Sequence, residues 1–235
     1  MGCDVLDFFE ADVTRGASPR VVFTSSQLSV PLETTHANLS RVQSPAVSFL
    51  ATCAGCNFAY CTVRNLGLNV SAWHSIESDP SCRAVTAQLI PPSQLREPCH
   101  DVTRLPPNFH KTHVDFHINT SPCQSFSSCQ TNPKGFRDTC RAAPARASAM
   151  LHASLSATNP HIKKLVENVQ FHPSLRADEL KFQALWCDKF YPLNASDYGS
   201  PSSRPRQYMA DFVRLDSLPH VKPLYPSALL PSHRR

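Results

Sequence analysis

Short apolar runs alternate with longer mixed segments between residues 47 and 213 of this chain. Four of the runs have the length and β-branched or aromatic content of buried strands, and three mixed segments have the spacing or capping residues of helices. We expect strands at 47–50, 70–76, 114–119 and 162–166, and helices at 58–66, 81–89 and 145–157. Strands that alternate with helices predict a single α/β domain.

The two ends of the chain lack this alternation. Residues 1–44 show no clear period, and we interpret them as an N-terminal extension whose order the pattern does not define, with a short strand candidate at 20–23. Residues 214–235 contain repeated prolines and end in basic residues, so we expect this tail to be largely unstructured. The domain is therefore predicted to span residues 45–213.

Composition adds only weak constraints. The 235 residues include 23 Lys and Arg against 18 Asp and Glu, a formal charge of +5 that suits a polyanionic partner and equally suits an ordinary basic protein. The first residues do not form a signal peptide, and no run reaches the ~20 apolar residues that span a membrane. We therefore expect an intracellular protein, nuclear in a eukaryote and otherwise cytoplasmic or nucleoid-associated, with no membrane partner.

Ten cysteines raise the question of a disulfide framework or a metal site. A reducing compartment favours free thiols. Cys53 and Cys56 have the spacing of a zinc knuckle, but no second pair repeats it, and His110, His113 and His117 lie near one another without a ligand pattern. We therefore predict no metal site.

One cysteine stands out by its position. The stretch 121–127 reads Ser-Pro-Cys-Gln-Ser-Phe-Ser and directly follows the predicted strand at 114–119. A cysteine placed just beyond a strand end, behind a proline, is well positioned to act as a nucleophile at the edge of a sheet. Cys123 is the candidate.

Three motifs in this order resemble the cytosine-5 DNA methyltransferase family. They are Pro-Cys-Gln-x-Phe-Ser at 122–127, Glu-Asn-Val at 167–169, and Tyr-Gly-x-Pro-x-x-Arg-x-Arg at 198–206, where Ser202 replaces the usual Gln. Lys134-Gly135-Phe136-x-Asp138 also resembles the segment that follows the family's nucleophile. The resemblance covers roughly residues 45–213.

The resemblance implies a Rossmann-like, doubly wound mixed sheet and transfer of a methyl group from S-adenosylmethionine to C5 of cytosine. Cys123 would add covalently to C6 of the base, and Glu167 would hold the N3 proton and the exocyclic amine. Arg204 and Arg206, which share one face of an extended segment, would hold the base carbonyl, a flanking phosphate and the Glu167 loop. The implied partner is double-stranded DNA with the target cytosine flipped out of the helix.

The cofactor half of the resemblance is less complete. Glu77 follows the predicted strand 70–76, where a carboxylate can accept both ribose hydroxyls, and Asp101 matches the family's adenine contact. The resemblance further places Leu50, Gly55 and Pro122 at the cofactor. Of the family's glycine-rich turn only Gly55 is present, so Thr52 and Ala54 add side chains where we expect positive φ, which predicts weak cofactor binding.

The family's later parts are not found in this sequence. Members continue into a target-recognition region and a closing Gly-Asn motif, neither of which we identify after residue 213. Three interpretations stay open: a minimal enzyme, an enzyme that takes these parts from a partner chain, and a catalytically weak regulatory or scaffold homologue. A branch of the family modifies transfer RNA, so an RNA cytosine methyltransferase is a further alternative.

Overall fold

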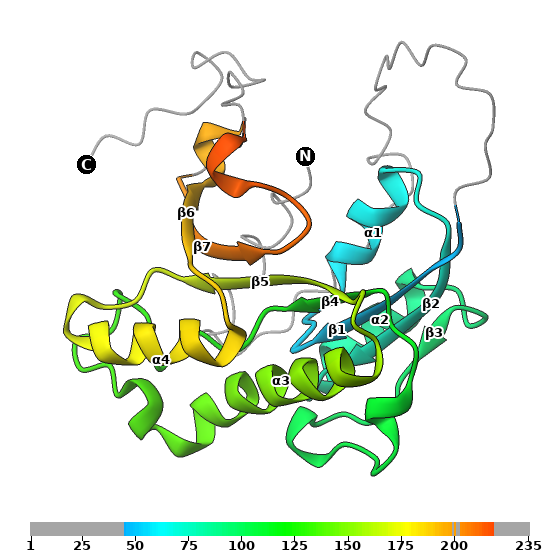
Figure 1. The fold of residues 1–235 in the computed structure, drawn as a ribbon, viewed down its shortest axis with the longest axis horizontal. Coiled ribbons are helices and arrows are strands. Elements are labelled where there is room, and N and C mark those ends of the chain that lie inside the picture. Colours follow the sequence, from blue (N-terminus) through cyan, green and yellow to red (C-terminus); the bar gives the residue numbers. More distant parts are fainter. Residues whose placement is uncertain (1–44, 199, 201–202, 219–235) are drawn as a thin grey trace, which may run out of the picture.

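A seven-stranded mixed sheet organises the part of the chain that the computed structural model describes, which is residues 45–198, 200 and 203–218 (Figure 1). The strand order is β3-β2-β1-β4-β5-β7-β6. The first five strands are parallel, and β7 runs antiparallel to both β5 and β6. The strands are β1 (Val47–Thr52), β2 (Val70–Ile76), β3 (Leu95–Arg96), β4 (Phe116–Asn119), β5 (Lys163–Val169), β6 (Tyr191–Asn194) and β7 (Pro205–Ala210).

The strand order reverses between β1 and β4, because the chain first builds outward to β3 and then returns to the other side of β1. This reversal confirms the predicted doubly wound sheet. In such sheets a crevice for ligands forms outside the carboxyl ends of the strands on either side of the reversal. The loops that follow β1 and β4 are therefore the first places to look for a site.

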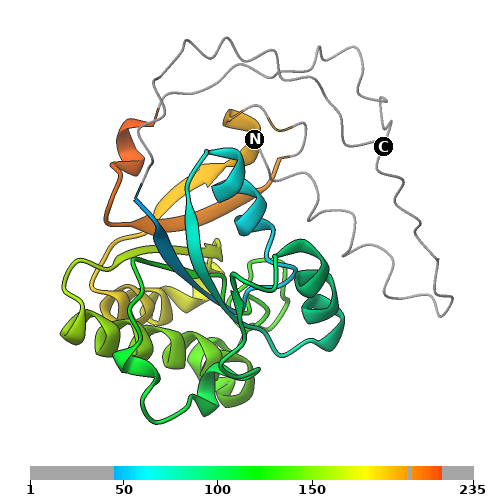
Figure 2. The same cartoon turned by 90° about the vertical axis from the view of Figure 1, so that its right-hand side faces the viewer.

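Within the described residues, four α-helices cover the two faces of the sheet: α1 (Phe58–Asn65), α2 (Pro80–Leu89), α3 (Thr139–Thr158) and α4 (Arg176–Trp186). Helices α3 and α4 lie together on one side of the sheet (Figure 1), and a view from the right-hand side shows them again below it (Figure 2). Tyr60 and Val63 of α1 pack instead with Phe49 and Trp73 in a cluster on the opposite face.

Most predicted elements are found, with shifted ends. The strand at 70–76 is found as predicted, and Asp79 caps α2 by accepting hydrogen bonds from the Ser81 and Cys82 amides at 2.7 and 3.3 Å. Strand β5 continues to Val169, so Glu167 lies inside the strand and not after it, which corrects the predicted end at 166. Helix α3 begins at Thr139 and contains Pro144, whereas the sequence predicted a start at 145.

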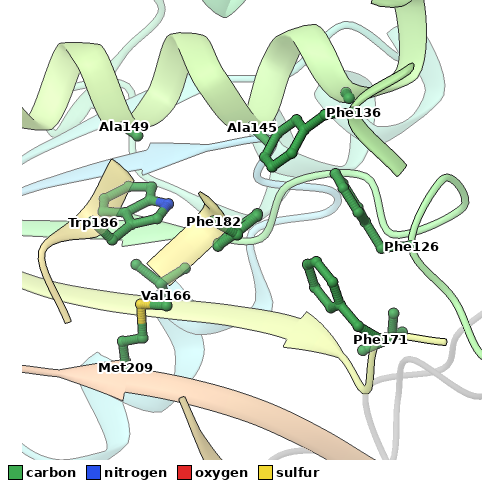
Figure 3. Close-up of a cluster of buried hydrophobic side chains, with 11 residues drawn as sticks. Phe126, Phe136, Ala145, Ala149, Val166, Phe171, Phe182, Trp186 and Met209 are labelled. Carbon is green, nitrogen blue, oxygen red and sulfur yellow. The ribbon is translucent and has the colours of Figure 1, made fainter. Parts of the chain in front are cut away.

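An aromatic cluster anchors the loop that follows β4 (Figure 3). Phe126 in this loop is fully buried and stacks on Phe171 with ring centroids 4.7 Å apart. Phe136 and Phe182 meet Phe126 edge to face from other segments. Burying one such ring stabilises a fold by about 1.5–3 kcal/mol. The cluster therefore holds the segment just after Cys123 in one place.

The predicted tail is partly ordered at its start. Leu215 is buried and begins a 3₁₀ turn, Leu215–Ser217, although the prediction began the tail at residue 214. The rest of the tail and the strand candidate at 20–23 lie outside the described residues. Within the described part of the chain, we find no helix with both the length and the apolar character needed to cross a bilayer.

Asn57 joins the loop after β1 to β2 and α2. Its side-chain nitrogen donates to Ser75 Oγ and Thr86 Oγ1, each at 2.9 Å, and its oxygen accepts the Trp73 indole N–H at 2.8 Å. The residue is buried and left-handed, with φ of 57°. Asn tolerates this backbone region better than most residues.

We expect Asn57→Ala to lower the free energy of unfolding by about 3 kcal/mol, because three buried groups lose a partner and Ala must adopt positive φ. Urea denaturation followed by circular dichroism measures the effect. Asn108→Ala is the matched control, since Asn108 is exposed and makes no side-chain capping bond. Equal stability of the two variants would contradict the anchoring role of Asn57.

Candidate active site

The loop after β1 meets the end of β2 through Glu77. Glu77 Oε2 accepts the Gly55 amide at 2.7 Å, and Oε1 accepts the Asp79 amide at 2.9 Å. The carboxylate therefore stands at the carboxyl end of β2, as predicted, and both of its oxygens already hold backbone N–H groups. A carboxylate in this place can exchange such partners for ligand hydroxyls.

The backbone of this loop differs from the prediction. Positive φ occurs at Cys53 (54°), Gly55 (52°) and Asn57 (57°). The expectation of positive φ at Thr52 and Ala54 is wrong, because Thr52 is the last residue of β1 and the turn begins after it. The side chains at those two positions therefore do not prevent the loop from forming.

Leu50 lies inside β1 with its side chain fully buried, where it packs in a cluster with Ile76. This burial leaves only its main chain for the predicted contact with a cofactor. Cys53, at the start of the loop, packs against the same cluster.

The Cys53 thiol has a raised pKa. Burial raises the pKa of Cys53 to about 12, with further increases from the negative charges of Glu77 and, more weakly, Asp101. Asp101 itself caps a short turn by accepting the amide and hydroxyl of Thr103 at 2.9 and 2.7 Å, and these hydrogen bonds lower the pKa of its carboxyl. Both predicted cofactor carboxylates follow the carboxyl ends of neighbouring parallel strands, Glu77 after β2 and Asp101 after β3.

A buried polar chain ties the loop after β4 to the loop after β1. The Asn119 side chain donates to Thr52 Oγ1 at 2.8 Å and accepts the Ser121 hydroxyl at 2.5 Å. Next to this buried chain, the exposed Thr120 donates its hydroxyl to the Cys53 carbonyl at 2.6 Å. These hydrogen bonds were not predicted, although a polar Asn-Thr-Ser run at the end of an apolar strand is a visible signal. The hydrogen bonds position Pro122 and Cys123 relative to the loop of Gly55.

Cys123 begins a tight turn. Its carbonyl accepts the amides of Phe126 and Ser127 at 2.9 and 3.0 Å, and its side chain packs partly buried against the aromatic cluster. Pro122, directly before it, is also partly buried.

The next strand in the sheet, β5, carries Glu167. Strands β4 and β5 pair in parallel as far as Asn119, which lies opposite Val166. Of the predicted catalytic residues, Cys123 therefore follows β4 and Glu167 lies on the neighbouring strand β5.

Arg206 holds Glu167 in place. Arg206 Nε lies 2.9 Å from Glu167 Oε1, and the two side chains are only 18% and 24% exposed. The antiparallel register places Arg206 opposite Val169 on β5, which puts its side chain diagonal to Glu167. The predicted contact between Arg206 and the Glu167 segment is confirmed. Arg204 precedes β7, and its amide donates to Asn194 Oδ1 at 2.8 Å.

A pocket of about 310 Å³ opens beside this ion pair. Both predicted arginines line it, together with polar groups that the sequence analysis did not single out. The lining residues are Ser127, Ser128, Cys129, Val169, Gln170, Ser203, Arg204, Pro205 and Arg206. Two guanidinium groups with serine hydroxyls suit a phosphate or another anion. Within the described residues no group of three metal-ligating side chains is close enough to hold a metal ion.

Comparison with known proteins identifies the fold. No protein-family model matches the chain, and no curated protein matches its sequence. The structure is similar to that of a protein described as a DNA modification methyltransferase encoded within an E. coli prophage, with a TM-score of 0.51 and 20% identity over 70% of this chain and 46% of that one. It is also similar to the Entamoeba histolytica methyltransferase EhMeth, with a TM-score of 0.51 and 13% identity over 77% of this chain and 58% of that one.

A further similarity is to S. pombe Dnmt2, with a TM-score of 0.47 and 15% identity over 71% of this chain and 49% of that one. The chain thus spans about half the length of these proteins. The doubly wound sheet, with β7 inserted antiparallel between β5 and β6, is the Rossmann-like fold of S-adenosylmethionine-dependent methyltransferases.

Proposed function

We propose that the chain is an S-adenosylmethionine-dependent methyltransferase that modifies C5 of cytosine in DNA through a covalent adduct with Cys123. The observation that carries this proposal is the Glu167 carboxylate, held by Arg206 at 2.9 Å on the strand next to the Pro122-Cys123-Gln124 turn. Strand β5, which carries Glu167, pairs on one side with β4, which leads into the Cys123 turn, and on the other side with β7, which carries Arg206, and this arrangement supports the proposal.

The chemistry assigns one task to each side chain. The Cys123 thiolate adds to C6 of cytosine, and Glu167 in its protonated form donates to N3, so the ring electrons reach C5 as an enamine. C5 then takes the methyl group that S-adenosylmethionine supplies as an electrophile. Loss of the C5 proton returns electrons to the ring and expels the thiolate. The Arg206 guanidinium orients the Glu167 carboxyl for proton donation to N3.

Residues that follow β1, β2 and β3 fit the proposed cofactor. The Glu77 carboxylate has the two acceptor oxygens that a ribose diol requires, and the side chain of Asp101 is 44% exposed and able to accept from an adenine amine. Gly55 has a left-handed backbone and no atom within 4 Å of where a Cβ would stand, so the loop leaves open space there. Glu77, Gly55 and Asp101 are the proposed binding residues.

DNA is the proposed substrate because two arginines line the pocket and the chain carries a net charge of +5. The prophage protein that shares the fold is itself described as a DNA modification methyltransferase. Because this chain spans about half of that protein, we propose that target recognition comes from a partner chain or from residues outside the described part. The target cytosine would have to flip out of the duplex to reach Cys123.

Transfer of a labelled methyl group tests the proposal. The chain is incubated with labelled S-adenosylmethionine and, separately, with duplex DNA and transfer RNA, and label in 5-methylcytosine is measured. Label in DNA is the expected result. Label in transfer RNA alone would show that the substrate is RNA and not DNA. Cofactor binding without label in either nucleic acid would favour the regulatory homologue.

We expect Glu77→Ala to weaken binding of S-adenosylhomocysteine about 30-fold or more, because two hydrogen bonds to a charged acceptor are lost. Titration calorimetry measures the affinity. Glu97→Ala is the matched control, since Glu97 is an exposed acid close to the end of β3. Equal affinity of the two variants for S-adenosylhomocysteine would show that the cofactor does not bind at the end of β2.

A further inference from the structure

Two thiols meet beside the proposed cofactor loop. The sulfur atoms of Cys56 and Cys82 lie 3.7 Å apart, although the residues belong to the loop after β1 and the first turn of α2. Both side chains are partly exposed, and the nine described cysteines are all free thiols. Neither cysteine belongs to the motifs that carry the proposed methyl transfer.

The backbone on both sides of this pair is already fixed. Asn57, next to Cys56, donates to Thr86 Oγ1 at 2.9 Å, and Thr86 lies one helical turn after Cys82. On the other side, the Gly55 amide binds Glu77 at 2.7 Å. The Cys82 amide binds the capping carboxylate of Asp79 at 3.3 Å.

These three hydrogen bonds keep the two sulfur atoms adjacent as long as the loop and the helix stay folded. Closing 3.7 Å to the ~2.05 Å of a disulfide then needs small side-chain rotations more than backbone movement. The geometry therefore favours disulfide formation between Cys56 and Cys82 over disulfide formation by chance encounters of other thiols.

We propose that Cys56 and Cys82 form a modification site for two-electron oxidants such as peroxides, which join them in a disulfide and tie the loop of Gly55 to α2. One thiolate attacks a peroxide oxygen, breaks the O–O bond and becomes a sulfenic acid, with release of water. The second thiol attacks that sulfur, the S–S bond forms, and the sulfenic oxygen leaves as a second water. Two thiols and one hydrogen peroxide thus give one disulfide and two waters.

The reaction is expected to be slow at neutral pH. Burial, followed by the hydrogen bond and charge of Cys56 and the charges of Asp79 and Glu77, raises the pKa of Cys82 to about 12. The thiolate is the reacting form, so few molecules of Cys82 are reactive at any moment. A mildly alkaline incubation of the reduced full chain is therefore the appropriate condition.

Peptide mapping without reduction tests the site. The full chain is treated with a small excess of hydrogen peroxide, excess thiol is blocked, and the digest is analysed by mass spectrometry. A cross-linked peptide pair containing Cys56 and Cys82 is expected, with its loss in Cys56→Ser and in Cys82→Ser. Cys61→Ser is the control, because Cys61 is partly exposed on the adjacent α1 and should leave the cross-link unchanged.

Thermal unfolding of the oxidised chain provides a second measurement. A cross-link that fits the native geometry should raise Tm by about 5 °C relative to the reduced chain, because it constrains the unfolded state. The increase should disappear in Cys82→Ser. Sulfenic or sulfinic acid without a cross-link, a dominant different pairing, or a lower Tm on oxidation would each overturn the proposal. None of these outcomes depends on whether the chain transfers methyl groups.

Discussion

Duplex DNA that contains 5-fluorocytosine at target positions is expected to form a stable covalent adduct with the chain and none with Cys123→Ser. The thiolate adds to C6 and the methyl group reaches C5, but fluorine does not leave as a proton does, so the thiolate stays bound. A serine hydroxyl at the same turn is far less nucleophilic than a thiolate and should give no adduct. Denaturing electrophoresis with labelled DNA measures the adduct.

Two control variants make this result specific. Cys187→Ser removes an exposed thiol from the end of α4 and should leave the adduct unchanged. Cys129→Ser changes a thiol that lines the pocket, so it tests whether a neighbouring sulfur is the true nucleophile. An adduct that persists in Cys123→Ser, or that disappears only in Cys129→Ser, would contradict the assignment of Cys123.

Glu167→Gln is expected to lower methyl-transfer turnover by about 100-fold or more, equivalent to about 2.7 kcal/mol of transition-state stabilisation. Glutamine keeps the size of the side chain but has no carboxyl proton to donate to N3. The free energy of unfolding should fall by about 1 kcal/mol or less, because the ion pair with Arg206 is partly solvated, at 24% and 18% exposure. Steady-state kinetics and urea denaturation measure the two effects separately.

Glu179→Gln is the matched control for this experiment. Glu179 also forms an ion pair with an arginine, Arg176, but on α4, where its other carboxylate oxygen accepts the Gln207 side-chain amide at 3.2 Å. It should retain nearly full turnover. Near-normal turnover in Glu167→Gln would instead show that the carboxylate on β5 is structural, and a similar fall in both variants would indicate a general loss of folded protein.

The elements that the sequence predicted well are those with strong local signals. The apolar run at 70–76 became β2, and the Asp79-Pro80 start became the capped beginning of α2. Strands β3 and β6 and helix α4 were missed. Strand β3 has two residues and β6 four, and the charged residues in the first turn of α4 obscure its apolar face, so these elements depend on tertiary packing more than on local pattern.

The α/β alternation and the identity of the motif residues could be read from the sequence alone, because hydrophobic period and residue type are local properties. Only the tertiary structure decided which of those residues meet. The Arg206–Glu167 ion pair depends on β7 entering the sheet antiparallel to β5, and the Gly55–Glu77 bond depends on β1 and β2 pairing in register. The contact of Cys56 with Cys82 arises in the same way. Such contacts join segments that lie far apart in the chain. Strand order and register bring these segments together, and local sequence preferences do not specify either of them.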